Sequence, residues 1–151
     1  RPVQTGRDTL TMRVLLCTSN APGAVFIRWM THSDWSHAAL VSDDGWAIEA
    51  TWPEVRKCRV EEIMAKHTRH ILVDLYCKAP VRAWKAAEEQ VGKPYDMTAL
   101  FGWLSGRNWQ EDDQWFCSEL VAWVFEQGGS PLFRDGSCHR VTPNDLWMVR
   151  P

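Results

Sequence analysis

The chain has 151 residues, 45% of them hydrophobic, and a formal net charge of −2 from 17 basic and 19 acidic side chains. This length and composition suit one globular domain with a single core, and the dispersed, balanced charge argues against a nucleic-acid-binding protein. No apolar run approaches the roughly 20 residues of a membrane-spanning helix, so no transmembrane segment is expected.

The polar N-terminal residues, 1–11, lack the charged-then-apolar pattern of a secretory signal, whereas Met12 opens a strand-like segment over residues 12–18. We therefore interpret residues 1–11 as a tag or upstream extension and residues 12–151 as a single domain. Without a visible signal, cytoplasmic synthesis is expected, and export by another route stays open.

Two short apolar segments, residues 36–42 and 46–51, flank an Asp-Asp-Gly turn sequence and predict a β-hairpin. A three-residue loop with Gly45 in the left-handed conformation would place His37 and Glu49 on one face of the hairpin. As diagonal neighbours they would lie roughly 7–8 Å apart between backbones, a span that a glutamate side chain can close. A four-residue loop would put them on opposite faces.

Hydrophobic periodicity predicts further helices and one more strand, which together give an α+β fold with helices packed on an antiparallel sheet. Thr142 and Pro143 predict a capped closing turn, and the polar residues 105–114 are expected to form a cleft wall. The remaining predicted elements are a short helix or turn at 25–30, a helix near 60–67, a strand at 71–76, and helices at about 82–91, 96–104 and 117–127.

The helix predicted at 117–127 begins with a cysteine, which places Cys117 in its first turn. The helix dipole favours a thiolate there by about 0.3–1 kcal/mol, too little to activate a thiol alone, so a cationic neighbour is needed. His37 has the best context of the five histidines, and Glu49 would orient and charge its imidazole. Five irregularly spaced cysteines predict no disulfide framework, which leaves a free thiol available.

Five segments occur in this order along the chain: Trp35–Val41, Ile48–Ala50, Gly92–Asp96, Phe116–Val121 and Thr142–Leu146. In these segments and their order the chain resembles the permuted NlpC/P60 papain-like hydrolases of the YiiX/YebB type, in which the histidine strand precedes the cysteine helix. Ordinary papain-like enzymes have the reverse order. The resemblance implies a circularly permuted papain-like fold with Cys117 and His37 as the catalytic pair. It also implies that Glu49 is the third polar residue and that Tyr95 contacts substrate or the oxyanion.

The resemblance further implies a cysteine hydrolase that cleaves an amide bond, in a peptide or a peptidoglycan fragment, through an acyl-enzyme on Cys117 with His37 as general base. Two alternatives stay open. One is a lipid-directed acyltransferase or thioesterase that uses the same pair on an acylated substrate. The other is a non-catalytic module that binds a glycan or peptide, with Cys117 as a small buried hydrophobic residue. No cofactor is expected, and the oligomeric state stays open.

Ten tryptophans are the compositional outlier, and most of them are expected in the core. Trp35 flanks the histidine strand and Trp115 precedes the cysteine helix, so these two are predicted to line the cleft and contact substrate. No metal site is predicted. His67 and His70 have helical i, i+3 spacing, but no Cys-x-x-Cys pair accompanies them, and His70 fits the opening of the strand at 71–76.

Overall fold

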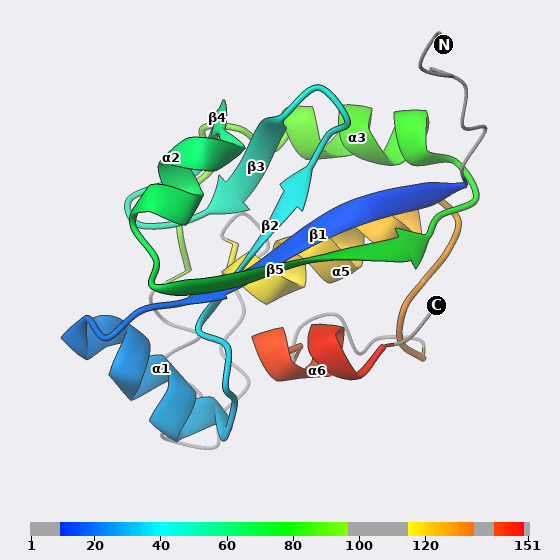
Figure 1. The fold of residues 1–151 in the computed structure, drawn as a ribbon. Coiled ribbons are helices and arrows are strands. Elements are labelled where there is room, and N and C mark those ends of the chain that lie inside the picture. The colour runs from blue at the N-terminus through cyan, green and yellow to red at the C-terminus, as the bar shows by residue number, and fades with distance from the viewer. Residues whose placement is uncertain (1–9, 97–114, 135–140, 150–151) are drawn as a thin grey trace, which may run out of the picture.

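The computed structural model describes residues 10–96, 115–134 and 141–149. An antiparallel five-stranded sheet in the order β4-β3-β2-β1-β5 forms the centre, and helices cover both of its faces (Figure 1). The elements are β1 (Thr11–Thr18), α1 (Pro22–Thr31), β2 (His37–Val41), β3 (Trp46–Ala50), β4 (Val55–Arg59), α2 (Val60–Ala65), β5 (Arg69–Tyr76), α3 (Pro80–Glu88), α5 (Cys117–Gln127) and α6 (Pro143–Met148).

The central strands are buried on both faces, and their side chains contribute alternately to two separate hydrophobic cores. In β1, Val14 and Leu16 enter the larger core, whereas Leu15 and Cys17 enter the smaller one. This alternation follows from the two-residue period of a strand. A strand buried on both faces therefore has a continuous apolar sequence, as residues 14–17 do.

The larger core lies between the sheet and helices α3, α5 and α6, and Figure 1 shows α5 running behind the sheet. Helix α5 packs on β2 and β3 through apolar residues such as Val121 and Phe125, which are almost completely buried. The smaller core lies on the opposite face, where α2 contributes Val60 and Ile63. His37 and Cys117 are the first residues of β2 and α5, two elements that pack on each other.

The described residues confirm the predicted α+β class, while several element bounds differ from those predicted. Helix α3 begins at Pro80 instead of residue 82, because proline suits the first helical turn. It ends at Glu88 rather than 91, and Val91, expected on the inner side, is 43% exposed. Strand β1 begins at Thr11, within the segment interpreted as an extension, of which residues 1–9 lie outside the described residues. The helix predicted at 96–104 and the polar loop at 105–114 also fall outside them, except for Asp96.

Strand β4 was not predicted from the sequence. Its residues, Val-Arg-Lys-Cys-Arg, carry three basic side chains, so no apolar alternation identifies them. The strand nevertheless pairs along its whole length with β3 and adds an edge to the sheet. No helix in the described parts of the chain is long and apolar enough to cross a bilayer.

Candidate active site

The β2–β3 hairpin brings His37 and Glu49 into contact. Leu40 pairs with Ile48, and Gly45 closes the turn at φ 82°, so the three-residue loop and its register are those predicted from the sequence. Both side chains therefore share a face of the sheet. His37 Nε2 lies 2.5 Å from Oε2 of Glu49, which is hydrogen-bonding distance.

Hydrogen bonds from two other elements fix the start of β2. The backbone N–H of Ser36 donates to the carbonyl oxygen of Cys17 at 3.1 Å, and its hydroxyl donates to Oγ1 of Thr18 at 3.2 Å. Arg28 of α1 donates to the same Thr18 oxygen at 2.8 Å. These contacts anchor the residue before His37 to β1 directly and to α1 through Thr18.

Arg56 of β4 holds the Glu49 carboxylate from the side opposite His37. Glu49 is 3% exposed, and Arg56 of β4 donates to its Oε1 from Nε at 2.7 Å and approaches it with Nη2 at 2.6 Å. Burial raises the pKa of Glu49, but the hydrogen bonds and charges of His37 and Arg56 outweigh it and bring the pKa to about 2. The buried carboxylate is therefore ionised at neutral pH.

Cys117 is the first residue of α5, directly after the N-cap Phe116, as predicted, and is 1% exposed. Its side chain forms a hydrogen bond with that of His37. Burial lowers the pKa of His37, but hydrogen bonds to Cys117 and Glu49, together with their charges, raise it to about 10. Because Nε2 of His37 contacts Glu49, Nδ1 is the nitrogen left for the thiol. The imidazole thus lies between the sulfur and the carboxylate.

The residue that follows Cys117 secures the start of the helix. Ser118 is completely buried, and its hydroxyl donates to the carbonyl oxygen of Val141, just before α6. The backbone N–H of Leu120 donates to the carbonyl oxygen of Phe116 at 3.0 Å. The backbone N–H of Cys117 precedes the first intrahelical donors, so it is among the N–H groups that a helix leaves without an internal partner.

Tyr95 lies beside the cysteine helix and lines the pocket described below. It forms an isolated parallel bridge with Trp115, and its ring lies 5.9 Å from that of Phe116 between centroids. Burial, followed by the nearby charge of Cys117, raises the pKa of Tyr95, which keeps the hydroxyl protonated at neutral pH. The phenol can therefore donate a hydrogen bond near the sulfur.

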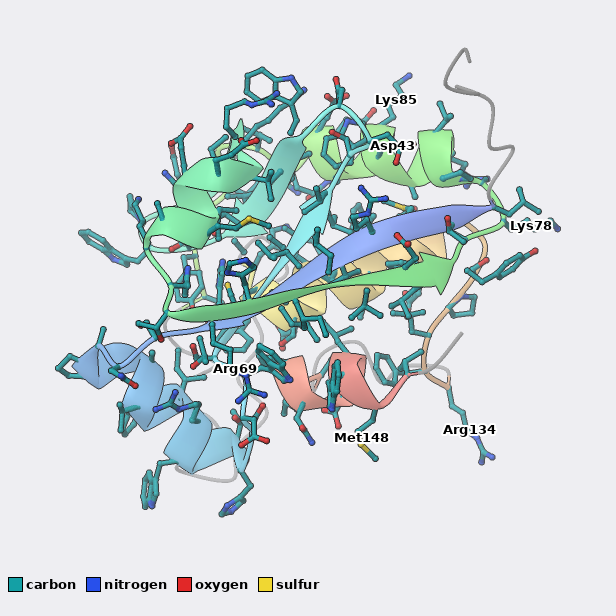
Figure 2. The ribbon with its side chains drawn as sticks, in the orientation of Figure 1. Asp43, Arg69, Lys78, Lys85, Arg134 and Met148 are labelled. Atoms are coloured by element: carbon teal, nitrogen blue, oxygen red, sulfur yellow. The ribbon has the colours of Figure 1, made fainter. Side chains whose placement is uncertain are left out.

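The structure places Trp35 and Trp115 in the core, contrary to the prediction that they line the cleft. Trp35 is 2% exposed and stacks under the guanidinium of Arg69, labelled in Figure 2, 4.6 Å from the ring centroid. Trp115 is 8% exposed, and its indole N–H donates to Gln90. Neither residue borders the described pocket, because packing of the sheet against the helices covers both rings. Trp52 lines it instead and is 71% exposed.

A pocket with a volume of about 510 Å³ opens beside the contact between His37 and Glu49. Its walls come from α1, from the segment between β3 and β4, and from α2. Side chains of the pair, and that of Tyr95, form part of its lining. Apolar residues supply much of the rest, namely Ala24, Ile27, Trp52, Pro53 and Ile63.

The two histidines weighed as metal ligands lie in different surroundings. His67, just after α2, stacks against His37 with ring centroids 5.6 Å apart and planes within 2°. His70 is exposed on β5. Within residues 10–96, 115–134 and 141–149, no group of three or more His, Cys, Asp or Glu side chains is arranged to hold a metal ion.

Comparison with known proteins bears on this geometry. Residues 14–135 match the profile of a family described as permuted papain-like amidase enzymes, YaeF/YiiX, C92 family. The chain belongs to this family. The matched segment contains the histidine strand, the glutamate strand and the cysteine helix, so the predicted resemblance to permuted papain-like enzymes of the YiiX type is confirmed.

Among solved structures, the chain is similar to a crystal structure of the metalloprotein yiiX from Escherichia coli O157:H7. The two structures superpose with a TM-score of 0.62 and 24% sequence identity, over 82% of this chain and 69% of yiiX. At this identity the likeness shows the fold alone, and it confirms the predicted permuted papain-like architecture. No curated protein matches the chain.

Proposed function

We propose that the protein is a cysteine amidase that cleaves the amide bond of a peptide or acylated amine, with Cys117 as nucleophile, His37 as general acid and base, and Glu49 as the group that orients and charges the imidazole. Membership of a papain-like amidase family supports the reaction class. The observation that carries the assignment of roles is the imidazole of His37, hydrogen-bonded to Cys117 on one side and to the buried Glu49 on the other.

In the proposed reaction, the Cys117 sulfur attacks the amide carbonyl carbon, and a carbon–sulfur bond forms. The carbon–nitrogen bond then breaks as His37 gives its Nδ1 proton to the leaving amine. Water then attacks the carbonyl carbon of the thioester and transfers a proton to His37. The carbon–sulfur bond breaks, which releases a carboxylic acid and restores the Cys117 sulfur. The backbone N–H of Cys117 and the hydroxyl of Tyr95 are the proposed donors to the oxyanion.

The first test measures the reactivity of Cys117 without needing a substrate. Limiting iodoacetamide is applied between about pH 5 and 9, and labelled cysteines are identified by peptide mapping. Burial raises the pKa of Cys17, of Cys58 and of Cys77, so these thiols serve as unreactive references within the same protein. We expect labelling near pH 6 at Cys117, lost in folded His37→Ala.

The second test detects the acyl-enzyme. Peptide amides, peptidoglycan peptides and fatty-acyl amides are incubated with the wild type and with Cys117→Ser, and intact mass spectrometry follows the protein. We expect a mass increase equal to the acyl part of the substrate in the wild type, with a free amine as product. Selective labelling together with turnover that survives Cys117→Ser would contradict the proposal. Absence of selective labelling would instead favour a binding module.

A lipid-directed acyl transfer is the second candidate, supported by the apolar wall of the pocket beside His37. Such a wall suits a hydrocarbon chain as well as an apolar side chain. Product analysis separates the two functions. Release or transfer of a fatty acyl group from an ester would favour the second candidate, and a free amine from a peptide would favour the amidase.

A further inference from the structure

His67 lies flat against His37 and is anchored to the end of helix α2. Its Nδ1 lies 2.7 Å from the carbonyl oxygen of Ile63, four residues earlier. A carbonyl oxygen only accepts hydrogen bonds, so Nδ1 must carry a hydrogen and Nε2 is the nitrogen that gains or loses a proton. Nothing in the proposed reaction requires this second imidazole.

We infer that His67 is a positioning residue for His37, which holds the ring of His37 between Cys117 and Glu49. This inference rests on the proposed function, since it concerns how the proposed base is held. It adds a residue that neither touches the sulfur nor takes part in proton transfer.

The inference follows from the contacts of His37. Its hydrogen bonds, to Cys117 and to Glu49, restrain the edges of the ring. The parallel ring of His67, with its centroid 5.6 Å away, stacks against it and opposes tipping of the imidazole. Because His67 is hydrogen-bonded to the last turn of α2, the face contact is itself fixed.

The charge state of His67 is compatible with this role. The pKa of His67 is lowered overall, chiefly by burial and also by the positive charges of His37 and Lys66. The hydrogen bond to the Ile63 carbonyl and the charge of Glu49 raise it, but by less. His67 is therefore uncharged at neutral pH. The titratable and charged side chains around the stacked pair are Glu49 on β3, Arg56 and Cys58 on β4, Glu54 before β4, Glu62 and Lys66 at α2, Cys17 on β1 and Cys117 on α5.

Like charges at close separation disfavour each other's protonated form. Because His67 is uncharged at neutral pH, it can lie against a positively charged His37 without opposing that charge.

The test compares His67→Phe with His67→Ala, using the pH dependence of Cys117 alkylation by iodoacetamide. Phenylalanine keeps a flat ring and cannot be protonated, whereas alanine removes the ring. The Ile63 carbonyl keeps a donor in both variants, because the backbone N–H of Lys66 also contacts it at 3.1 Å. His70→Phe and His70→Ala, at an exposed position on β5, are the matched controls.

We expect His67→Phe to keep the wild-type rate and pH profile, because it keeps a flat ring against His37. We expect His67→Ala to react about tenfold more slowly across the range, because the ring of His37 is less well oriented. The His70 variants should follow the wild type. A wild-type rate in His67→Ala, or a rate in His67→Phe as slow as that of His67→Ala, would overturn the inference.

An NMR titration gives a readout that depends neither on alkylation nor on turnover. In the wild type, His67 should titrate below a free histidine, and in His37→Gln its pKa should rise by about half a unit or more, because a positive neighbour is removed. An unchanged pKa would overturn the inference even where His67→Ala does not fold. Poor labelling of wild-type Cys117 would instead reject the proposed function, and the titration would still test the coupling between the two rings.

Discussion

Glu49 is the residue on which the charges of the site converge. Its carboxylate is almost fully buried between His37 and Arg56, each at hydrogen-bonding distance from a different oxygen. Removing such an ion from water is unfavourable, and only close partners offset the loss of hydration. Both oxygens are therefore committed to cations, which leaves the carboxylate able to support a positive charge on His37.

Replacement of Glu49 by glutamine should keep the shape of the site and remove the charge. The pKa of His37 should fall, because hydrogen bonding and charge from Glu49 both raise it. We expect the alkylation of Cys117 near pH 6 to slow by about 10- to 100-fold. The rate is measured with iodoacetamide under second-order conditions.

Glu54→Gln is the matched control for that measurement, since Glu54 borders the same pocket and is exposed. Its rate should equal that of the wild type. A Glu49→Gln rate equal to the wild type would remove Glu49 from the mechanism.

At the residue scale, the sequence identified the three central side chains of the candidate site but not two of the side chains that contact them. Cys117, His37 and Glu49 are accessible from sequence because hairpin register and a helix start are local properties. Arg56 was missed because its strand carries no apolar alternation. His67 was missed because ring stacking between separate elements leaves no signature in spacing. Trp35 and Trp115 were misplaced, since neighbourhood in sequence does not determine which face of an element is covered.

At the scale of elements, the C-terminal end of α5 is fitted closely against β5 and α3. A Cβ atom added at Gly128 would lie 2.5 Å from Sγ of Cys77 and 3.0 Å from Cβ of Ala83. Gly128 has an ordinary φ of −75°, so its requirement for glycine comes from this close approach and not from backbone conformation. The helix therefore abuts the residue that follows β5 without room for a methyl group.

Gly128→Ala should lower the free energy of unfolding by about 1–3 kcal/mol, because the added methyl group overpacks a filled site. Cys77→Ala in the same chain should recover part of that loss, since it removes the sulfur that the methyl group meets. The free energies are measured by urea denaturation and combined in a double-mutant cycle.

Gly23→Ala is the control for that cycle, because Gly23 lies in α1 and a Cβ there would meet nothing within 4 Å. Its stability should rise by about 0.4–1 kcal/mol, as expected for glycine replaced in a helix. Independent effects of Gly128→Ala and Cys77→Ala would contradict the proposed contact.

Elements with strong periodicity or local turn signals were predicted well. The hairpin, the cysteine helix and the strand of residues 12–18 were found with bounds that differ by at most one residue. Helix α1 extends from Pro22 to Thr31, beyond the predicted residues 25–30, because Pro22 starts it and His32 ends it in the left-handed conformation. A helix end depends on capping by single residues, which periodicity does not report.

The whole molecule should be most stable in mild acid, because three buried groups titrate away from their ordinary ranges. Glu49, with a pKa of about 2 against an ordinary 4.5, stabilises the fold above pH 4.5 and loses that effect as the pH falls towards 2. His37, with a pKa of about 10 against 6.5, stabilises it below pH 6.5 and loses that effect as the pH rises. Burial, together with the charge of Asp96, raises the pKa of Glu119 to about 8 against 4.5.

Glu119 thus keeps a proton in the folded state that the unfolded chain has released, so stability should decline as the pH rises from 4.5 to 8. Glu119→Gln should remove that decline and raise the free energy of unfolding near pH 8.5 by on the order of 1–3 kcal/mol. Urea denaturation between about pH 4 and 9 measures the profile. Glu61→Gln, at an exposed position on α2, should leave it unchanged.

The separation of the site's residues along the chain has a consequence for how a newly made molecule acquires reactivity. His37 and Glu49 meet within one hairpin, whereas Cys117 is synthesised 80 residues after His37 and joins them only when α5 docks on the sheet. A ribosome-bound chain that ends before residue 117 therefore carries a completed acid–base pair without a sulfur to activate. The proposed nucleophile arrives last, and its alkylation rate in a pulse-labelled translation reaction would record the moment at which α5 docks on the sheet.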